Sequence, residues 1–260
     1  MILSLPVTGV FNTNAYFYVD DATGHGFLLD PGAEADTLLA VIRQRGFVIE
    51  KILLTHGHFD HMGAAAQIQD ALSIPICMHE RGREYTENPR WNLSEGCGLY
   101  IKLDDVSYLP DGSRIALERN PVFSLTMHYV PGHTTDSVFY YSAKDNVAFV
   151  GDSIFKNSFG LTHFPGGDEQ TLMQSITQRI LKLPQETVLL SGHTEPTTVG
   201  AERERSWYAP FFELIPVMLT GGVKTLEDAE TLLKNNAADL IGVGREILKN
   251  PYWLMEQMEK

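Results

Sequence analysis

A short run of the chain is rich in side chains that bind metal ions. Between His56 and His61, three imidazoles and one carboxylate occur within six residues, directly after the apolar, strand-like stretch 51–55. Imidazole and carboxylate suit divalent zinc, iron or manganese, and the end of a strand leaves them free to converge. A solvated loop that happens to be rich in histidine is the alternative interpretation. The four candidate ligands are His56, His58, Asp60 and His61.

The spacing inside this run divides the ligands into two pairs. His56 and His58 project to the same side of an extended segment, because side chains alternate along it. Asp60 and His61 begin the turn into a helix that the sequence predicts over residues 61–69, so they can face a second ion. One cluster can therefore serve two metals.

Three further candidate ligands lie in the same local setting, an apolar strand that stops at a turn. They are His133 in Pro-Gly-His-Thr, Asp152 in Gly-Asp-Ser and His193 in Gly-His-Thr. A glycine precedes each one, and glycine permits the unusual backbone angles and close approach that a crowded ion requires. A lone Gly-His at a strand end is usually a capped turn. Together with the His-rich run, however, these places predict a metal site.

The four motifs resemble those of the metallo-β-lactamase superfamily over residues 1–207. Within it, the chain is similar to glyoxalase II-like (hydroxyacylglutathione hydrolase-like) hydrolases, notably a short bacterial branch with Phe-Pro-Gly-Gly-Asp at 164–168. The resemblance implies an α/β (α+β) fold, the four-layer αβ/βα sandwich. It also implies a ligand set: His56, His58 and His133 for the first metal, Asp60, His61 and His193 for the second, and Asp152 as the bridge.

Such a centre predicts hydrolysis without a nucleophilic side chain. Two divalent ions about 3.5–4 Å apart hold one water and lower its pKa, so that metal-bound hydroxide attacks an acyl carbonyl. Asp60 is expected both to bind metal and to orient that hydroxide. Asp30, in the Asp-Pro-Gly turn at 30–32, is expected either to support the metal ligands or only to form the turn. Zinc is the expected ion, with iron or manganese as alternatives. All five histidine ligands must be neutral, so occupancy and activity should fall together below about pH 6.

The prediction is thus a binuclear metal-dependent hydrolase that cleaves a thioester, hydroxyacylglutathione-like, or a related acyl bond in a small metabolite. A mononuclear iron enzyme or a flavin-coupled redox enzyme acting on sulfur compounds is the alternative. The complete second ligand set opposes the mononuclear version. The resemblance opposes diiron redox chemistry, because such relatives usually carry an acid where His58 stands. A metal-binding or scaffolding protein without turnover is the third possibility.

Substrate contacts are less clear from the sequence. In glyoxalase II, a cation that follows the metal-binding acid binds the carboxylates of glutathione together with further basic residues. In this chain, Leu161 stands at the position of that cation. Lys156 and His163 are the substrate-binding candidates that remain near this position. Trp91 and Tyr100, in a segment at 80–109 predicted to be irregular, are either substrate contacts or apolar anchors of that segment.

Composition limits the partners. The 260 residues include 20 Lys and Arg against 33 Asp and Glu, a net charge of −13, with no basic block that would follow a phosphate backbone, so nucleic acid is not expected. No stretch is long and apolar enough for a membrane span, and residues 1–6 lack the basic start of a signal peptide. Cys77 and Cys97 form no disulfide framework. A cytoplasmic location without membrane contact is therefore expected.

The last part of the chain departs from this family. Residues 208–260 are predicted to form a βαβα tail whose strands, within 215–223 and 239–245, pair in parallel. The tail resembles the last two βα units of old yellow enzyme-type NADH:flavin oxidoreductases, but six units of such a barrel are missing, so flavin binding is not expected. Its unpaired edges predict docking or a homo-oligomer. The implied phosphate-binding positions are Gly221, Gly222, Gly244 and Arg245.

Overall fold

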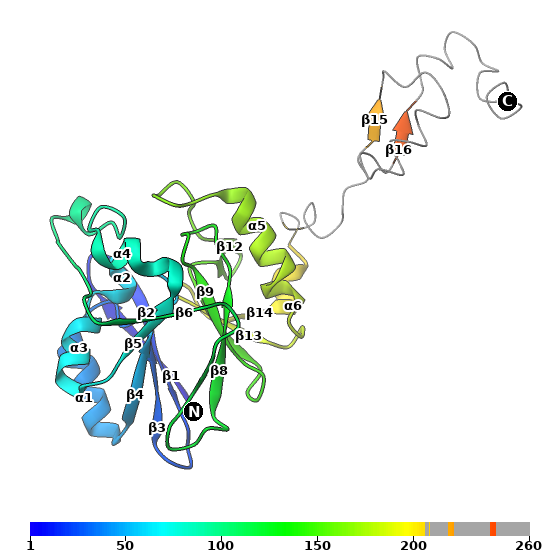
Figure 1. The fold of residues 1–260 in the computed structure, drawn as a ribbon. Coiled ribbons are helices and arrows are strands. Elements are labelled where there is room, and N and C mark those ends of the chain that lie inside the picture. The colour runs from blue at the N-terminus through cyan, green and yellow to red at the C-terminus, as the bar shows by residue number, and fades with distance from the viewer. Residues whose placement is uncertain (206–207, 209–217, 221–239, 243–260) are drawn as a thin grey trace, which may run out of the picture. The chain divides into compact units, whose positions relative to one another are not determined.

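The computed structural model describes residues 1–205, 208, 218–220 and 240–242. The chain separates into two compact units, Met1–Arg205 and Ser206–Lys260. The first unit contains two six-stranded sheets and the helices that cover them (Figure 1). Within the described residues, no helix has both the length and the apolar character to cross a membrane.

The first sheet has its strands in sequence order, β1 to β6. β2 and β3 form an antiparallel hairpin, as the alternation over residues 11–20 and the strand and turn pattern over 24–32 predict from the sequence. In contrast, β3 to β6 run parallel. One expectation is wrong here: the segment 80–109 is not irregular throughout, because its end forms a strand that pairs with β5. The bounds are β1 (Ile2–Thr8), β2 (Asn12–Val19), β3 (His25–Leu29), β4 (Val48–Leu53), β5 (Ile76–His79) and β6 (Val106–Leu109).

The second sheet has the order β14-β13-β10-β9-β8-β7. β10 and β13 are parallel neighbours, and the remaining pairs are antiparallel. A small hairpin, β11 (Ile154–Phe155) with β12 (Ser158–Phe159), follows β10. The bounds are β7 (Arg114–Ala116), β8 (Ser124–Tyr129), β9 (Val138–Ser142), β10 (Val147–Gly151), β13 (Val188–Ser191) and β14 (Thr197–Thr198).

Helices cover the outer face of each sheet, which gives the predicted four-layer αβ/βα sandwich. In Figure 1, α1 and α3 lie against the first sheet, and α5 and α6 lie on the side of the second. Three short helical pieces, including α4 (Arg83–Glu87), lie between β5 and β6. The bounds of the covering helices are α1 (Ala35–Arg45), α3 (Ala65–Leu72), α5 (Glu169–Gln178) and α6 (Val199–Arg203).

The helix predicted over 61–69 is instead two helices, α2 (Phe59–Met62) and α3. The backbone N–H of Ala64 donates to the carbonyl of Pro31, 2.9 Å away, rather than to the preceding helical turn. A Cβ on Gly63 would lie 2.5 Å from the carbonyl oxygen of Gly32, so the two chain segments touch at this point. This contact interrupts the helix directly after the metal-binding run.

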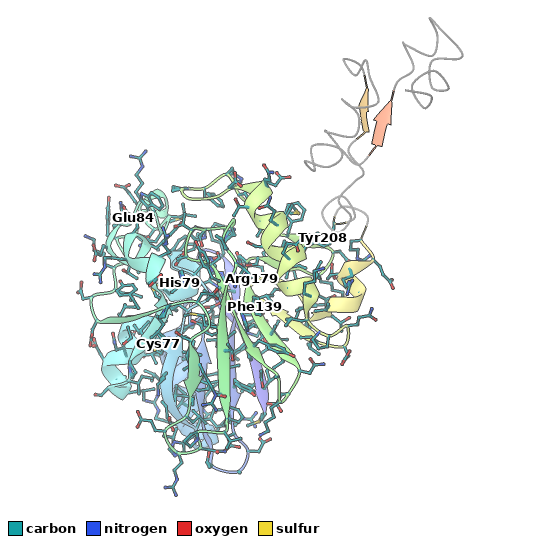
Figure 2. All side chains as sticks on the ribbon, turned by 45° about the vertical axis from the view of Figure 1, so that its right-hand side comes forward. Cys77, His79, Glu84, Phe139, Arg179 and Tyr208 are labelled. Atoms are coloured by element: carbon teal, nitrogen blue, oxygen red, sulfur yellow. The ribbon has the colours of Figure 1, made fainter. Side chains whose placement is uncertain are left out.

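Aromatic and aliphatic side chains fill the space between the sheets, among them Tyr18, Phe27 and Phe149. Figure 2 labels Cys77 and His79 of β5 in the first sheet and Phe139 of β9 in the second. Two buried tyrosines also join the layers by hydrogen bonds. Tyr16 of the first sheet donates to the carbonyl of Ser191 (2.6 Å), and Tyr140 of the second donates to that of Leu54 (2.8 Å). Both acceptors lie at strand ends that lead into candidate ligands.

In the second unit, β15 (Met218–Thr220) pairs in parallel with β16 (Leu240–Gly242). These strands fall within the two ranges where the sequence predicts strands. The two predicted helices lie outside the described residues, as do the four implied phosphate-binding positions. The flavin-related resemblance and the oligomerisation role of residues 208–260 therefore stay predictions.

Candidate metal centre

Five of the seven candidate ligands follow four strand ends that meet at one edge of the sandwich, and Asp60 and His61 lie in α2, which comes after the first of these ends. His56 and His58 follow β4 of the first sheet, and the other strand-end ligands follow β8, β10 and β13 of the second. Backbone hydrogen bonds hold these ends together, from Val138 N to Thr55 O (2.8 Å) and from Gly192 N to Gly151 O (3.0 Å). The sheet topology therefore brings together residues that are 137 positions apart in the sequence, from 56 to 193.

Three of the ligands form an imidazole group, His56, His58 and His133. One nitrogen of each ring lies within 4.8 Å of the others. His133 Nε2 is 3.0 Å from His58 Nδ1, and the three residues are only 1 to 3% exposed. This group matches the ligand set that the resemblance implies for a first metal.

Three others form a mixed group, Asp60, His61 and His193, whose ligand atoms also lie within 4.8 Å of one another. His193 Nε2 is 3.3 Å from Asp60 Oδ2. This group is more accessible, since the side chain of His193 is 26% exposed and that of Asp60 is 12% exposed, although His61 is fully buried. It matches the set implied for a second metal.

Asp152 lies between the two groups. Its Oδ1 is 3.3 Å from His61 Nε2, and its Oδ2 is 3.1 Å from His193 Nε2 and 3.7 Å from His133 Nε2. One carboxylate thus reaches members of both groups. The arrangement supports the bridging role that the resemblance implies.

The histidine rings are oriented by partners on their outer nitrogens. Nδ1 of His133 lies 2.6 Å from the carbonyl oxygen of Leu161, and Nδ1 of His193 lies 2.7 Å from that of Asn12. Nδ1 of His61 lies 3.0 Å from the carboxylate of Asp30. Because these acceptors require a protonated Nδ1, the neutral form of each ring turns an unprotonated Nε2 towards the centre.

Asp30 connects this orientation to the strand that carries the ligands. Its carboxylate also accepts hydrogen bonds from the backbone N–H and the hydroxyl of Thr55, at 2.8 and 2.7 Å. Thr55 immediately precedes His56. The carboxylate of Asp30 thus contacts a candidate ligand directly. This favours the supporting role over the simple turn role, the two that the sequence left open.

Several atoms of the centre that could bind a metal make no hydrogen bond to any residue that the structure describes. Nε2 of His56, Nε2 of His61 and Oδ1 of Asp152 are buried and make no hydrogen bond within the described part of the chain. Buried polar atoms are normally satisfied, and imidazole nitrogens with carboxylate oxygens are suitable donors for divalent ions. The residues present therefore fit a metal-binding cluster.

Burial keeps the imidazole group neutral. It lowers the pKa of His56, His58 and His133 below the ordinary histidine value, because the charged ring is poorly solvated there. Neighbouring imidazoles lower the pKa of His56 and His58 further. A set of neutral donors is therefore present at physiological pH.

Carboxylates dominate the mixed group. Burial alone would lower the pKa of His61, but Asp152, Asp60 and Asp30 together raise it well above the usual value. Burial also opposes the charged form of His193, but its hydrogen bonds with Asp152 and Asp60 raise its pKa to about 10. Without a metal, these two rings therefore hold protons at neutral pH.

Two of the predicted glycine positions are explained by the geometry. Gly151 has a φ of 50°, in the left-handed region that favours glycine. A Cβ on Gly192 would lie 2.4 Å from Asp152 Oδ1 and 2.5 Å from His61 Cε1. Gly192 therefore leaves the space in which the bridging carboxylate and a histidine of the mixed group approach each other.

An open cavity of about 350 Å³ lies over the centre. Four ligands of the two groups, His58, His133, Asp60 and His193, line it together with Asp152 and Asn12. Sequence reasoning singled out Leu161, at the position of a substrate-binding cation, but not the other residues of its wall, because apolar residues give no chemical signal of their own. That wall consists of Phe11, Phe59, Leu93, Phe155, Leu161 and Phe164.

The two substrate-binding candidates do not line this cavity. Lys156 is exposed, and its Nζ pairs with Glu195 Oε2 at 2.6 Å. His163 is exposed and its ring lies 4.2 Å from that of Phe164. Trp91 and Tyr100 are also absent from the cavity wall.

Known proteins resemble this chain in sequence and in fold. A model of the metallo-β-lactamase superfamily matches residues 8–193. A hydroxyacylglutathione hydrolase of Haemophilus influenzae is 31% identical over 205 residues, which cover 76% of this chain and 93% of the relative. A crystal structure of a B3 metallo-β-lactamase, BLEG-1, is 33% identical with a TM-score of 0.74, over 82% of this chain and 99% of that one. A protein solved in a di-iron-bound form is also 33% identical, with a TM-score of 0.68, over 77% and 97%. The chain belongs to the metallo-β-lactamase superfamily.

Proposed function

We propose that the protein is a binuclear metal-dependent hydrolase that cleaves a thioester or a related acyl bond, in the manner of the glyoxalase II-like hydrolases. One observation carries the proposal: two three-residue ligand groups, joined by Asp152, lie side by side under an open cavity. Zinc is the proposed ion, with iron as the alternative that the di-iron relative suggests.

The ligand sets have distinct parts in this proposal. The imidazole group would hold one ion, the mixed group a second, and Asp152 would contact both. When bound, such ions polarise a carbonyl and make a water nucleophilic at neutral pH. No serine or cysteine nucleophile is required, in agreement with the residues that line the cavity.

Asp60 is the chain's own acid–base group at the cavity. Burial favours its neutral form, but His61 and His193 hold the pKa of this carboxyl below its ordinary value, so it is ionised at neutral pH. Its side chain also lines the cavity. An ionised carboxylate there can accept a hydrogen bond from the attacking water and orient it towards the substrate carbonyl.

The ligands of the mixed group count against the mononuclear iron alternative. That enzyme would need one complete group, whereas two complete and adjoining groups and a shared carboxylate are present. The likeness to BLEG-1 favours a different second candidate, hydrolysis of the amide bond of a β-lactam. Water activated at such a metal centre can attack the carbonyl of either acyl bond.

The test is an assay of purified protein with its metal content determined. The substrates are S-D-lactoylglutathione, acyl-coenzyme A thioesters, the uncharged thioester S-hexanoyl-N-acetylcysteamine and the β-lactam nitrocefin, and D60A is the control variant. Thioester turnover that chelation removes and that D60A loses would support the proposal. Turnover of nitrocefin alone, or metal-loaded protein that cleaves no thioester, would overturn it.

A further inference from the structure

The cavity over the metal centre has two chemically different surfaces. Its floor is polar and consists of the candidate ligands, whereas its wall consists of six apolar side chains from five separate segments. Among the residues that the structure describes, neither lysine nor arginine lines it. At about 350 Å³, it lies near the lower end of the range typical of small-molecule pockets.

The apolar wall lies directly against the ligands. The ring of Phe164 is 5.8 Å from that of His58, in the imidazole group, and the ring of Phe155 is 5.9 Å from that of His193, in the mixed group. A substrate whose carbonyl reaches the centre must therefore place its neighbouring atoms against hydrocarbon.

Part of this wall is exposed to water. Phe11 is 53% exposed and packs against Phe59 with ring centroids 5.9 Å apart, and Leu161 is 58% exposed. Large apolar side chains on both sides of a functional cavity gain stability when a ligand covers them. An apolar ligand is favoured here by the wall that it would cover.

An anionic ligand meets no positively charged side chain among the described residues that line the cavity. The nearby Lys156 already pairs with Glu195, and the carboxylates of Asp60 and Asp152 add negative charge to the floor. An anionic group placed against the wall would lose its hydration without gaining a side-chain cation, which is costly. Glutathione, which carries carboxylates, is such a ligand.

We propose that the substrate is an uncharged thioester or related acyl compound with an apolar acyl chain, which packs against Phe11, Phe155, Leu161 and Phe164. This inference rests on the proposed function and names its substrate class. Leu161 is the specificity-determining residue most open to testing. Its backbone carbonyl, not its side chain, contacts His133, so its side chain can be changed without removing that contact.

Three thioesters with matched reacting groups separate the substrate question from the reaction itself. They are S-hexanoyl-N-acetylcysteamine, which is uncharged, S-succinyl-N-acetylcysteamine, with a carboxylate on the acyl side, and S-hexanoylglutathione, with carboxylates on the thiol side. We expect kcat/KM for the uncharged compound to exceed both others by at least about tenfold. Equal or better turnover of either anionic compound would overturn the inference while leaving the proposed hydrolase intact.

A cation placed on the wall should reverse this preference. In L161K, the ratio of kcat/KM for the succinyl compound to that for the hexanoyl compound should rise at least about tenfold. V122K is the matched control, because Val122 is 77% exposed and does not line the cavity. Metal content and melting temperature show whether both variants are folded. An unchanged ratio in folded, metal-loaded L161K would contradict the role of Leu161.

Binding gives a result even if no thioester is cleaved. Calorimetric titration of metal-loaded protein would compare two thioethers, S-hexyl-N-acetylcysteamine and S-(3-carboxypropyl)-N-acetylcysteamine, which have no scissile bond. Tighter binding of the hexyl compound, weakened in L161K but not in V122K, would support the apolar cavity even if the proposed reaction fails. Equal or tighter binding of the carboxylate compound, or no binding of either, would overturn it.

Discussion

The imidazole group and the mixed group differ in how each is prepared for an ion. The imidazole group is buried, and its rings have lowered pKa values, so neutral donors are present before metal arrives. In the mixed group, carboxylates raise the pKa of both histidines, so protons occupy the donor atoms. We therefore expect the two groups to bind metal differently: the imidazole group would only accept an ion, whereas the mixed group would have to release protons for it.

Removing the residue that both groups share should have the largest effect. In D152A, both ions lose a ligand, and His61 and His193 lose the carboxylate that faces them. We expect hydrolysis to fall about 1,000-fold or more, because a metal's contribution is worth several kcal/mol and each 1.36 kcal/mol is tenfold. Metal content by mass spectrometry and kcat/KM would measure it.

The control is D70N, a change at an exposed acid of α3. D70N should retain both ions and full activity. If D152A also retained two ions, Asp152 would not be the bridge, and the comparison between the two groups would have to be made without a shared ligand.

Proton release should distinguish the two binding steps. Because the pKa values of His61 and His193 are raised, both rings are protonated at pH 7 without metal, and affinity at the mixed group should increase with pH. With two protons released, this affinity should rise up to about 100-fold between pH 7 and 8. The imidazole group has lowered pKa values, so its affinity should stay nearly constant over that interval.

Calorimetric titrations in buffers of different ionisation enthalpy would count the protons at each step. Release of protons in the first step, or no release in the second, would contradict the assignment. The raised pKa values of the mixed group also refine the sequence prediction that metal occupancy falls below about pH 6. Loss of metal should begin at the mixed group, and at a higher pH.

The ligands could be predicted from the sequence because their residue types are chemically distinctive and each stands beside a turn. His133, Asp152 and His193 are far apart along the chain, yet glycine at a strand end marked all three. The wall of the cavity could not be found in this way. Phe11, Leu93 and Phe155 belong to residue types that usually form cores, and only the packing of the loops shows that they face the metal centre.

The fold followed the same rule. Alternation and turns predicted the hairpin of β2 and β3, which is local, whereas the strand β6 forms only because its partner β5 lies beside it. The break between α2 and α3 was also missed, because it depends on the contact of Gly63 with the distant segment at Gly32. Long-range contacts, not local propensity, decide these elements.

A change at Asp30 should also affect the metal affinities of the two groups differently, but by a smaller amount. In D30N, the mixed group keeps its ligands, but His61 loses a carboxylate partner at Nδ1. Loss of such a partner typically lowers metal affinity about 10- to 100-fold, so the second ion should bind that much more weakly while the first is little affected. Competition with a chelator of known affinity would measure both constants, with D70N again as the control. Equal weakening of both ions would show that Asp30 acts on the whole edge through Thr55 instead.

The smallest effects are expected at Lys156 and His163, the residues that the sequence suggested for substrate binding. Lys156 lies near the mixed group but pairs with Glu195, and His163 neighbours Phe164 beside the imidazole group. Neither side chain lines the cavity, so K156M and H163A should change kcat/KM for an uncharged thioester by about twofold or less, as surface changes usually cost under 0.5 kcal/mol. A tenfold rise in KM, with kcat unchanged, would show that one of them does bind substrate. That result would also show that substrate enters the cavity on the side of the ligand group next to that residue.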